Sequence, residues 1–192
     1  DPGRNARIVR DVLAALAAGR SPVVLTERRA HLDALEQAFT GKVKHLVVLR
    51  GGLGRRQVAA IQERLLAIPD AEERLLLATG RYLGEGFDDA RLDTLFLAMP
   101  ISWRGRVAQY AGRLHRRHDG KHEVRIQDYA DLKVPMLARM FDRRCRGYRA
   151  IGYGIVLPLG TVEGWPAEVD LPVEPEWQET YAASVRRLCR DG

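Results

Sequence analysis

Short, continuous runs of apolar residues alternate along the chain with longer segments in which apolar residues recur at helical spacing. The runs lie at residues 23–25, 46–49, 75–78, 95–98 and 124–129. Continuous apolar runs of this length are typical of strands covered on both faces, whereas alternating runs indicate strands with one face in water. The pattern therefore predicts a sheet that lies between two layers of helices.

The segments between the runs carry apolar stripes that fit one face of a helix. These stripes are formed by Leu32, Leu35 and Phe39; by Val58, Ile61 and Leu65; and by Val107, Ala111 and Leu114. An opening helix is expected over residues 5–18, because Gly19 is a natural C-terminal cap. Strands and helices that alternate in this way are joined by right-handed crossovers. We predict the α/β class, with a three-layer arrangement of a parallel sheet and helices on both faces.

The pattern loosens after Tyr153, where four prolines interrupt an acidic stretch. We predict one domain over residues 1–156 and an irregular, acidic, proline-containing tail over residues 157–192. Residues 176–189 of this tail are the best candidate for a final helix. The chain begins at Asp1 rather than at Met, and we expect it to be part of a longer protein.

Composition excludes two broad classes of protein. With 46% hydrophobic and 29% charged residues the chain can build a core, which excludes a wholly disordered protein. No apolar run approaches the roughly 18 residues that a membrane-spanning helix needs, which excludes an integral membrane protein. Cys145 and Cys189 fit neither a disulfide framework nor a zinc site, and this favours a reducing, cytoplasmic compartment.

Basic charge is concentrated in one part of the chain. The formal net charge is +6, and residues 101–150 hold 13 Lys or Arg against 5 Asp or Glu. A local excess of this size suggests contact with a polyanion such as nucleic acid. The chain has 27 arginines and 4 lysines. Arginine suits phosphate recognition, but a genome that favours arginine codons explains the number equally well, so only arginines at meaningful positions are evidence.

Small polar residues, glycines and arginines follow three of the predicted strands. Thr26 to Arg29 follow the first, Arg50 to Gly52 the second, and Thr79 and Gly80 the third. Ligands of open parallel sheets bind at the carboxyl ends of the strands. Glycine allows backbone amides to approach a phosphate closely, and a hydroxyl or guanidinium group completes the contact. The three strand ends together indicate a phosphate-binding edge.

The segment from Gln109 to Arg116 contains the sharpest pattern in the sequence. In a helix, Gln109, Gly112, Arg113 and Arg116 would share one face, opposite an apolar stripe. A glycine inside a helix costs about 1 kcal/mol relative to alanine, which suggests that something approaches the helix closely there. The two arginines could neutralise charge on a transferring phosphoryl group. The alternative is a solvated basic helix face.

These segments resemble the conserved motifs of superfamily-two helicases. The Gln-x-x-Gly-Arg-x-x-Arg pattern of residues 109–116 resembles the sixth motif, and residues 78–88, which end in Gly86-Phe87-Asp88, resemble the fifth. Residues 22–28 resemble the fourth, and residues 50–52 resemble the glycine-bearing motif that follows it. Order and spacing over about residues 5–130 are similar to the second RecA-like lobe of these ATP-driven motors. The leading glutamine is closer to the DEAH and restriction-enzyme-like branch than to the DEAD-box branch.

The resemblance implies a role for each matching residue. Arg113 and Arg116 would be arginine fingers that reach the γ-phosphate of ATP on a partner lobe, and Gln109 would help to position the attacking water. Gly86 and Asp88 would touch the nucleotide ribose. The residues expected to hold the sugar–phosphate backbone of one nucleic-acid strand, with DNA favoured over RNA, are Thr26, Arg28, Arg50, Gly51 and Thr79.

Two elements of such a site are missing from the sequence. None of the four lysines lies in the context of a phosphate-binding loop, and no Asp-Glu pair follows a strand to hold magnesium. The resemblance implies that both elements lie on an N-terminal RecA-like lobe of the same parent chain. ATP and Mg²⁺ would then be held mainly by that lobe, and we expect this chain alone to hydrolyse no ATP.

Three weaker features have two interpretations each. His115, His118 and His122 could ligate a metal, but surface histidines are the better interpretation, and we expect no metal site. Trp103, Trp165 and Trp177 could stack on bases, although lone tryptophans more often anchor packing. A further basic run after Pro135 fits a nucleic-acid face and a solvated helix equally well; it contains Arg139, Arg143, Arg144, Arg146 and Arg149.

The sequence thus favours the second lobe of an ATP-dependent helicase or translocase, in which closure of two lobes around ATP shifts the grip on one strand. The alternative is a non-catalytic module that binds nucleic acid or a partner and retains only the fold. A free-standing nucleotide-binding enzyme would need a base or nucleophile at the strand ends, and none is evident there.

Overall fold

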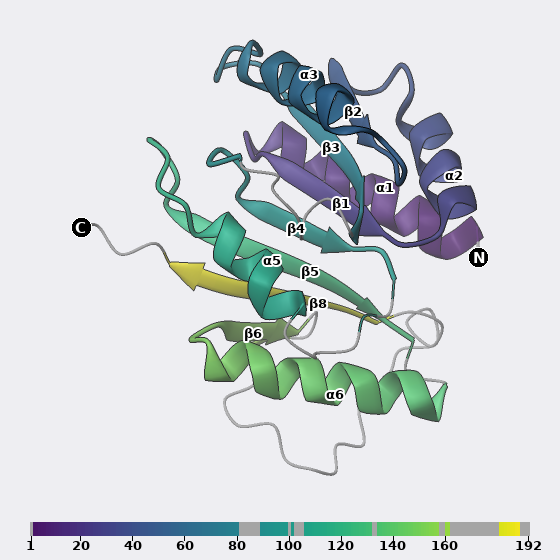
Figure 1. Ribbon diagram of the computed structural model, residues 1–192. Helices are drawn as coiled ribbons and strands as arrows, with labels where there is room; N and C mark the ends of the chain where they lie inside the picture. Colours follow the sequence, from purple (N-terminus) through teal and green to yellow (C-terminus); the bar gives the residue numbers. More distant parts are fainter. Residues whose placement is uncertain are drawn as a thin grey trace.

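The computed structural model describes residues 2–80, 89–99, 101, 106–131, 134–157, 160–161 and 181–188 (Figure 1). The helices in these ranges are α1 (Pro2–Ala17), α2 (Arg29–Phe39), α3 (Arg55–Leu66), α5 (Arg106–Leu114) and α6 (Pro135–Ala150). The strands are β1 (Pro22–Thr26), β2 (His45–Leu49), β3 (Arg74–Thr79), β4 (Thr94–Leu97), β5 (Glu123–Ala130), β6 (Gly154–Leu157), β7 (Gly160–Thr161) and β8 (Tyr181–Leu188).

The five strands expected from the apolar runs form a parallel sheet in the order β2-β3-β1-β4-β5. Parallel strands require crossover connections, and among the described residues α2 connects β1 to β2, α3 connects β2 to β3, and α5 lies between β4 and β5. The sheet continues past β5 with three antiparallel strands in the order β8-β6-β7. The predicted α/β class with a parallel sheet is therefore confirmed.

Helices cover both faces of the sheet, and neighbouring residues of one strand serve opposite faces. Val24 packs with α1 and α2 in one apolar cluster, and Val23 packs with α3, α5 and α6 in the other. All five side chains of β1 are buried. This explains why its apolar residues form a continuous run rather than an alternating one, and it confirms the three-layer prediction.

Helix α6 is fixed to the sheet by a buried ion pair. The Arg144 guanidinium donates two hydrogen bonds to the Asp128 carboxylate of β5, at 2.7 and 2.9 Å, and a third to the carbonyl of Ile101 at 2.8 Å. The Tyr148 hydroxyl also donates to Asp128, at 2.9 Å. Arg144 is 1% exposed and Asp128 is fully buried. Because both oxygens of the buried carboxylate have donors, the charges are compensated inside the core.

The predicted final helix is wrong for residues 181–188, which form the strand β8. This strand pairs antiparallel with β5 along its whole length, from Glu123↔Leu188 to Ala130↔Tyr181. The open edge of β5 presents unpaired backbone groups, and pairing with them outweighs the local helix preference of a segment rich in Ala, Arg and Leu. Strand β8, from the predicted tail, thus joins the sheet of the predicted domain, across the boundary predicted after residue 156. Residues 158–159, 162–180 and 189–192 of the predicted tail lie outside the described residues.

Within the described ranges, no helix has the length and hydropathy to cross a membrane.

We expect the Arg144→Leu variant to lower the free energy of unfolding by about 3–5 kcal/mol, because it leaves the Asp128 carboxylate buried without its cation. Urea unfolding at neutral pH measures this. The neighbouring Arg143→Leu variant is the matched control, since Arg143 is exposed, and it should change stability by about 0.5 kcal/mol or less. Equal losses in the two variants would show that the buried pair has no special role in stability.

Candidate functional site

The carboxyl ends of β1, β2 and β3 meet at one edge of the sheet and bring several predicted site residues together. Thr26 lies beside Thr79 in the register of β1 and β3, and Leu49 lies beside Ala78 in that of β2 and β3. The loop after β2 passes close to β3, because a Cβ atom on Gly51 would lie 3.8 Å from the Thr79 hydroxyl oxygen. Parallel pairing thus places these strand ends as expected.

The Thr79 hydroxyl is the least satisfied polar group at this edge. The residue is 7% exposed, and its Oγ1 atom has no hydrogen-bond partner among the described residues. A buried hydroxyl without a partner costs about 1–3 kcal/mol, so native proteins seldom retain one without a reason. A ligand oxygen or amide at this position would relieve that cost.

The Thr26 hydroxyl, in contrast, is engaged inside the protein. It lies 3.0 Å from His31 Nδ1, and His31 Nε2 lies 2.9 Å from Asn5 Oδ1 of α1. Thr26 itself is fully buried. Burial lowers the pKa of His31, and the charges of Arg4 and Arg28 lower it further. His31 was missed because the sequence pattern there indicates only an ordinary position of a helix.

The arginines near this edge are not equally available. Arg28 is exposed. The Arg50 guanidinium pairs with Glu36 and with Asp33, the latter at 3.3 Å, and both carboxylates belong to α2. Arg29 was not predicted as a site residue, yet its guanidinium donates a 2.7 Å hydrogen bond to the carbonyl of Gly51. Arg29 therefore holds the loop after β2 in place and adds a cation beside it.

Helix α5 contacts the same edge through one tyrosine. The Tyr110 hydroxyl donates a 2.9 Å hydrogen bond to the carbonyl of Gly80, the residue after β3. A Cβ atom on Gly80 would lie only 3.0 Å from that hydroxyl oxygen, so a larger residue there would displace the tyrosine. Tyr110 lies inside the predicted arginine motif, where the sequence pattern marked it as neither apolar core nor site.

The arginine motif is only partly helical. Gln109 and Gly112 are exposed and Arg113 is half-buried on α5, but the helix ends at Leu114. Arg116 lies in the turn that follows, so the expectation that it shares a helix face with the other three residues is wrong. A Cβ atom on Gly112 would have nothing within 4 Å. No described part of this chain makes the close approach that the glycine was expected to permit.

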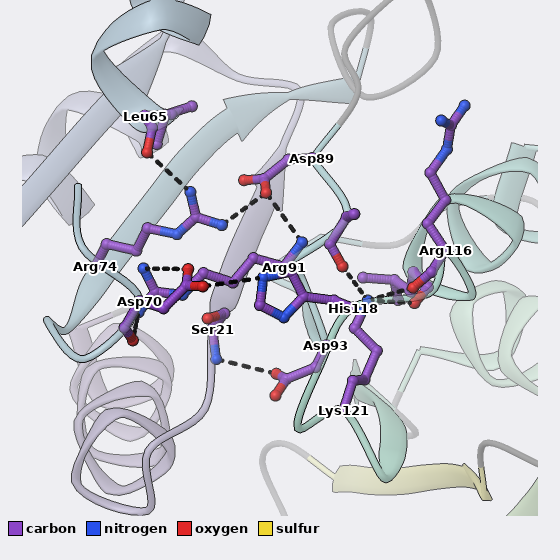
Figure 2. Close-up of polar contacts among 12 residues, drawn as sticks. Ser21, Leu65, Asp70, Arg74, Asp89, Arg91, Asp93, Arg116, His118 and Lys121 are labelled. Carbon is purple, nitrogen blue, oxygen red and sulfur yellow. Dashed lines mark hydrogen bonds and ion pairs between the residues drawn. The ribbon is translucent and has the colours of Figure 1, made fainter. Parts of the chain in front are cut away.

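The turn that holds Arg116 is fixed by a lysine at the amino edge of the sheet (Figure 2). The Lys121 ammonium donates to the carbonyls of Leu114 at 3.0 Å, Arg116 at 2.9 Å, and Ala90. An ammonium group has three donors, and three carbonyls match them. In Figure 2 the Arg116 side chain extends away from this cluster, while its backbone lies within it. The sequence around Lys121 suggested only a comparison with a phosphate-loop lysine and gave no sign of this structural role.

The segment before β4 is fixed at the same edge by two arginines, of which Arg74 is buried and Arg91 is partly buried. Arg74 pairs with Asp89 at 2.7 Å, and both side chains are almost fully buried. Arg91 donates to the carbonyls of Pro69 and Asp70, at 3.1 and 2.8 Å. These contacts fix the residues that directly follow Asp88. Asp88 and Gly86, both predicted to bind nucleotide, lie outside the described residues.

The predicted site residues therefore form two groups rather than one. Thr26, Gly51 and Thr79 lie at the carboxyl edge of the sheet. Helix α5 contacts that edge through Tyr110 and leads to Arg116, whose turn lies beside Ala90 at the opposite edge. The predicted site residues are thus spread between two opposite edges of one sheet, with α5 running from one edge toward the other.

The remaining sequence candidates can also be located. His115 Nε2 lies 2.7 Å from the Tyr153 hydroxyl, His118 pairs with Asp70 at 3.5 Å, and His122 is exposed. In the part of the chain that the structure describes, no three His, Cys, Asp or Glu residues converge as metal ligands. Trp103, Trp165 and Trp177 lie outside the described residues.

The comparisons with known proteins agree on the fold. The C-terminal part of the Fun30 ATPase domain aligns with a TM-score of 0.51 at 11% identity, over 61% of this chain and 37% of that one. T4 UvsW aligns with a TM-score of 0.50 at 17% identity, over 60% and 23%. The chain has a RecA-like α/β fold.

This RecA-like lobe spans well under half the length of either structure. A DEAD-box structure, Mss116p domain 2 bound to an RNA duplex, aligns less well, with a TM-score of 0.39 at 12% identity over 59% of this chain and 46% of that one. No protein-family profile and no curated protein matches the sequence.

We expect the free energy of unfolding to decrease as the pH is lowered, in part because of His31. Because its pKa in the folded state lies below the ordinary value of about 6.5, the unfolded chain takes up a proton first as the pH falls. The stabilisation that the neutral His31 side chain provides is complete above about pH 6.5 and is lost progressively as the pH falls below that value. Urea unfolding between pH 7.5 and 5.5 should therefore show the stability advantage of wild type over His31→Gln shrinking as the pH falls. The exposed His122→Gln variant controls for removal of a histidine, and an advantage that stays constant would contradict the assignment.

Proposed function

We propose that this RecA-like lobe is the second motor lobe of an ATP-dependent helicase or translocase that acts on nucleic acid, with DNA as the favoured substrate. It would work in the cytoplasm with an N-terminal RecA-like lobe of the same parent chain. The observation that carries the proposal is the separation of two polar surfaces on one rigid sheet. A motor has to hold two ligands, a nucleic-acid strand and a nucleotide, and has to link them mechanically.

The carboxyl edge is suited to hold a sugar–phosphate backbone. The Thr79 hydroxyl lacks a partner among the described residues, the Gly51 backbone lies beside it, and Arg28 is exposed close by. Backbone contacts of this kind carry no sequence information, which suits a protein that moves along any sequence. Thr26 would support this edge from within, because its hydroxyl is bound to His31. Arg50 would have to exchange its α2 carboxylates for a phosphate.

The arginine motif is suited to contact a nucleotide held by another lobe. Arg113 and Arg116 supply two guanidinium groups, and the open space beside Gly112 leaves room for a partner surface. Lys121 fixes the backbone of the Arg116 turn, so that the guanidinium is presented from a defined position. We assign Arg113 and Arg116 as arginine fingers and Gln109 as the residue that helps to position water. Gly86 and Asp88 would contact the ribose.

The arginines of the motif suit the phosphates of ATP, because guanidinium groups complement phosphate charge. Among the described residues, no three His, Cys, Asp or Glu side chains converge as metal ligands. ATP supplies the phosphoryl group and Mg²⁺ neutralises its charge when both are bound. The first lobe would hold both, and this chain alone is expected to hydrolyse no ATP.

The alternative is a non-catalytic module that binds nucleic acid or a partner protein and has kept only the fold. The ion pairs of Arg50 with Glu36 and Asp33 favour it, because they neutralise one of the expected backbone contacts. A phosphate-loop domain directly upstream in the parent gene would favour the motor. Its absence there would favour the module.

In the two-lobe protein, we expect Arg113→Ala or Arg116→Ala to reduce ATP turnover about a thousandfold, because an arginine finger stabilises charge in the transition state. ATP binding should largely survive. Steady-state turnover and nucleotide binding measure the two effects separately. Arg117→Ala, an exposed neighbour, is the matched control and should keep near-normal turnover. Normal rates in both finger variants would refute the assignment.

A second prediction separates binding from stability at the carboxyl edge. Thr79→Val keeps the shape of the side chain and removes only the hydroxyl, so it should weaken single-strand binding and reduce the stimulation of ATP turnover by nucleic acid. Stability should stay level or rise, because an unpaired buried hydroxyl is removed.

Thr26→Val is the matched control for this prediction, because it removes a hydroxyl bonded to His31 and should instead lower the free energy of unfolding by about 1 kcal/mol. Urea unfolding and fluorescence anisotropy with single-stranded DNA provide both measurements. Undiminished nucleic-acid binding by Thr79→Val would remove Thr79 from the proposed strand contact.

A further inference from the structure

The five arginines of helix α6 are divided between its buried face and its exposed face. Arg144 points into the core, where it binds Asp128. The other four are exposed and follow one another at i, i+4, i+7 and i+10; they are Arg139, Arg143, Arg146 and Arg149. Residues with this spacing form one stripe along a helix. We call these four residues the arginine stripe.

The arginine stripe lies opposite the side of α6 that packs against the sheet. Phe141, Cys145 and Tyr148 are buried on that inner side, together with Arg144. Burial raises the pKa of the Cys145 thiol to about 12, which marks that side as apolar. The buried ion pair of Arg144 with Asp128 fixes the inner side of α6 against the sheet. Rotation of the helix would break that pair, so the arginine stripe stays on the outer side.

The stripe carries a local excess of positive charge. Arg146 pairs with Asp142 one turn earlier, at 2.9 Å, and Asp142 is the one acidic residue of α6. Arg139, Arg143 and Arg149 make no ion pair with another described residue. Four cations against one anion, on a rigid helix, leave charge that has not been neutralised within the described chain. Exposed guanidinium groups that are not paired are suited to phosphate.

An apolar contact surface lies at the start of the same helix. Val134 and Met136 are 39% and 59% exposed, and they are two of the three large hydrophobic side chains that are exposed among the described residues. Residue 134 follows closely on the carboxyl end of β5, so this surface lies at the same edge of the sheet as Thr79. A flexible thioether beside cations can pack against an aromatic base while the cations contact the backbone.

We propose that Val134, Met136 and the arginine stripe form a second contact surface for single-stranded nucleic acid, which continues from the carboxyl edge along the outside of α6. The ten residue steps from Arg139 to Arg149 rise about 15 Å. A stacked strand advances about 3.4 Å per nucleotide, so this length matches roughly four phosphates with four guanidinium groups. The surface rests on the proposed nucleic-acid binding but requires no working motor, because it lies entirely within this chain.

Charge-matched variants of the 192-residue chain test the proposal. Arg143→Gln/Arg149→Gln removes two cations from the stripe, and Arg10→Gln/Arg64→Gln removes two exposed cations from α1 and α3. Binding of a fluorescein-labelled single-stranded oligothymidylate is measured by anisotropy over a series of salt concentrations. The stripe variant should bind about fivefold more weakly at low salt, and the slope of log K against log salt should fall by about 1.4, or 0.7 per lost phosphate contact. The α1/α3 variant should keep the wild-type slope.

Two outcomes would contradict the proposal that α6 forms a second contact surface. Wild-type affinity and slope in the stripe variant would show that α6 does not contact the strand, for instance because its partner is a protein. An equal loss in the two double variants would show that only net charge matters. Urea unfolding confirms that the exposed substitutions leave the fold intact.

The same measurements separate this proposal from the motor. If Thr79→Val weakens binding and the stripe variant does not, the proposed second contact surface is refuted and the proposed motor function is retained. If the stripe variant loses affinity while Arg113→Ala and Arg116→Ala leave turnover in the two-lobe protein unchanged, the motor assignment fails while the second surface stands.

Discussion

The buried pair of Arg144 and Asp128 is the interaction on which much of the lobe depends. It joins three parts of the chain, because Arg144 lies on α6, Asp128 lies on β5, and the third hydrogen bond reaches Ile101 between β4 and α5. A buried guanidinium with a single geometry fixes the rotation of the helix that carries it. The direction in which α6 presents its other arginines therefore follows from one internal contact.

The lobe uses its few lysines and many arginines for different purposes. Arginine forks hold buried or planar partners, as in the pairs of Arg144 with Asp128 and of Arg74 with Asp89. Lys121 instead collects three backbone carbonyls around one ammonium. The Arg91 guanidinium also collects backbone carbonyls, but through a planar fork, whereas the ammonium places its three donors around a single atom.

The proposed motor follows from where the sheet places its ends. Parallel strands gather their carboxyl ends at one edge, and a crossover helix such as α5 runs from that edge back to the other. The strand-contact candidates and the arginine motif are separated for this reason alone. In the proposed motor, the sheet between them would transmit a displacement from one surface to the other, which is what coupling between nucleotide and nucleic acid requires.

The alternation of strands and helices, the two-sided burial of the sheet and the polar residues at its strand ends could all be predicted from the amino-acid pattern. These follow from local periodicity and from the residues that a strand end or a helix end needs, so Val23 and Val24, or Thr79 and Gly80, can be interpreted without coordinates. Four features could not be predicted in this way: which arginine of α6 lies inside, the bond between Thr26 and His31, the position of Arg116 beyond the end of its helix, and the pairing of residues 181–188 as a strand. Each of these depends on a partner distant in sequence, and the energy of such a contact outweighs a local preference that amounts to a few tenths of a kcal/mol per residue.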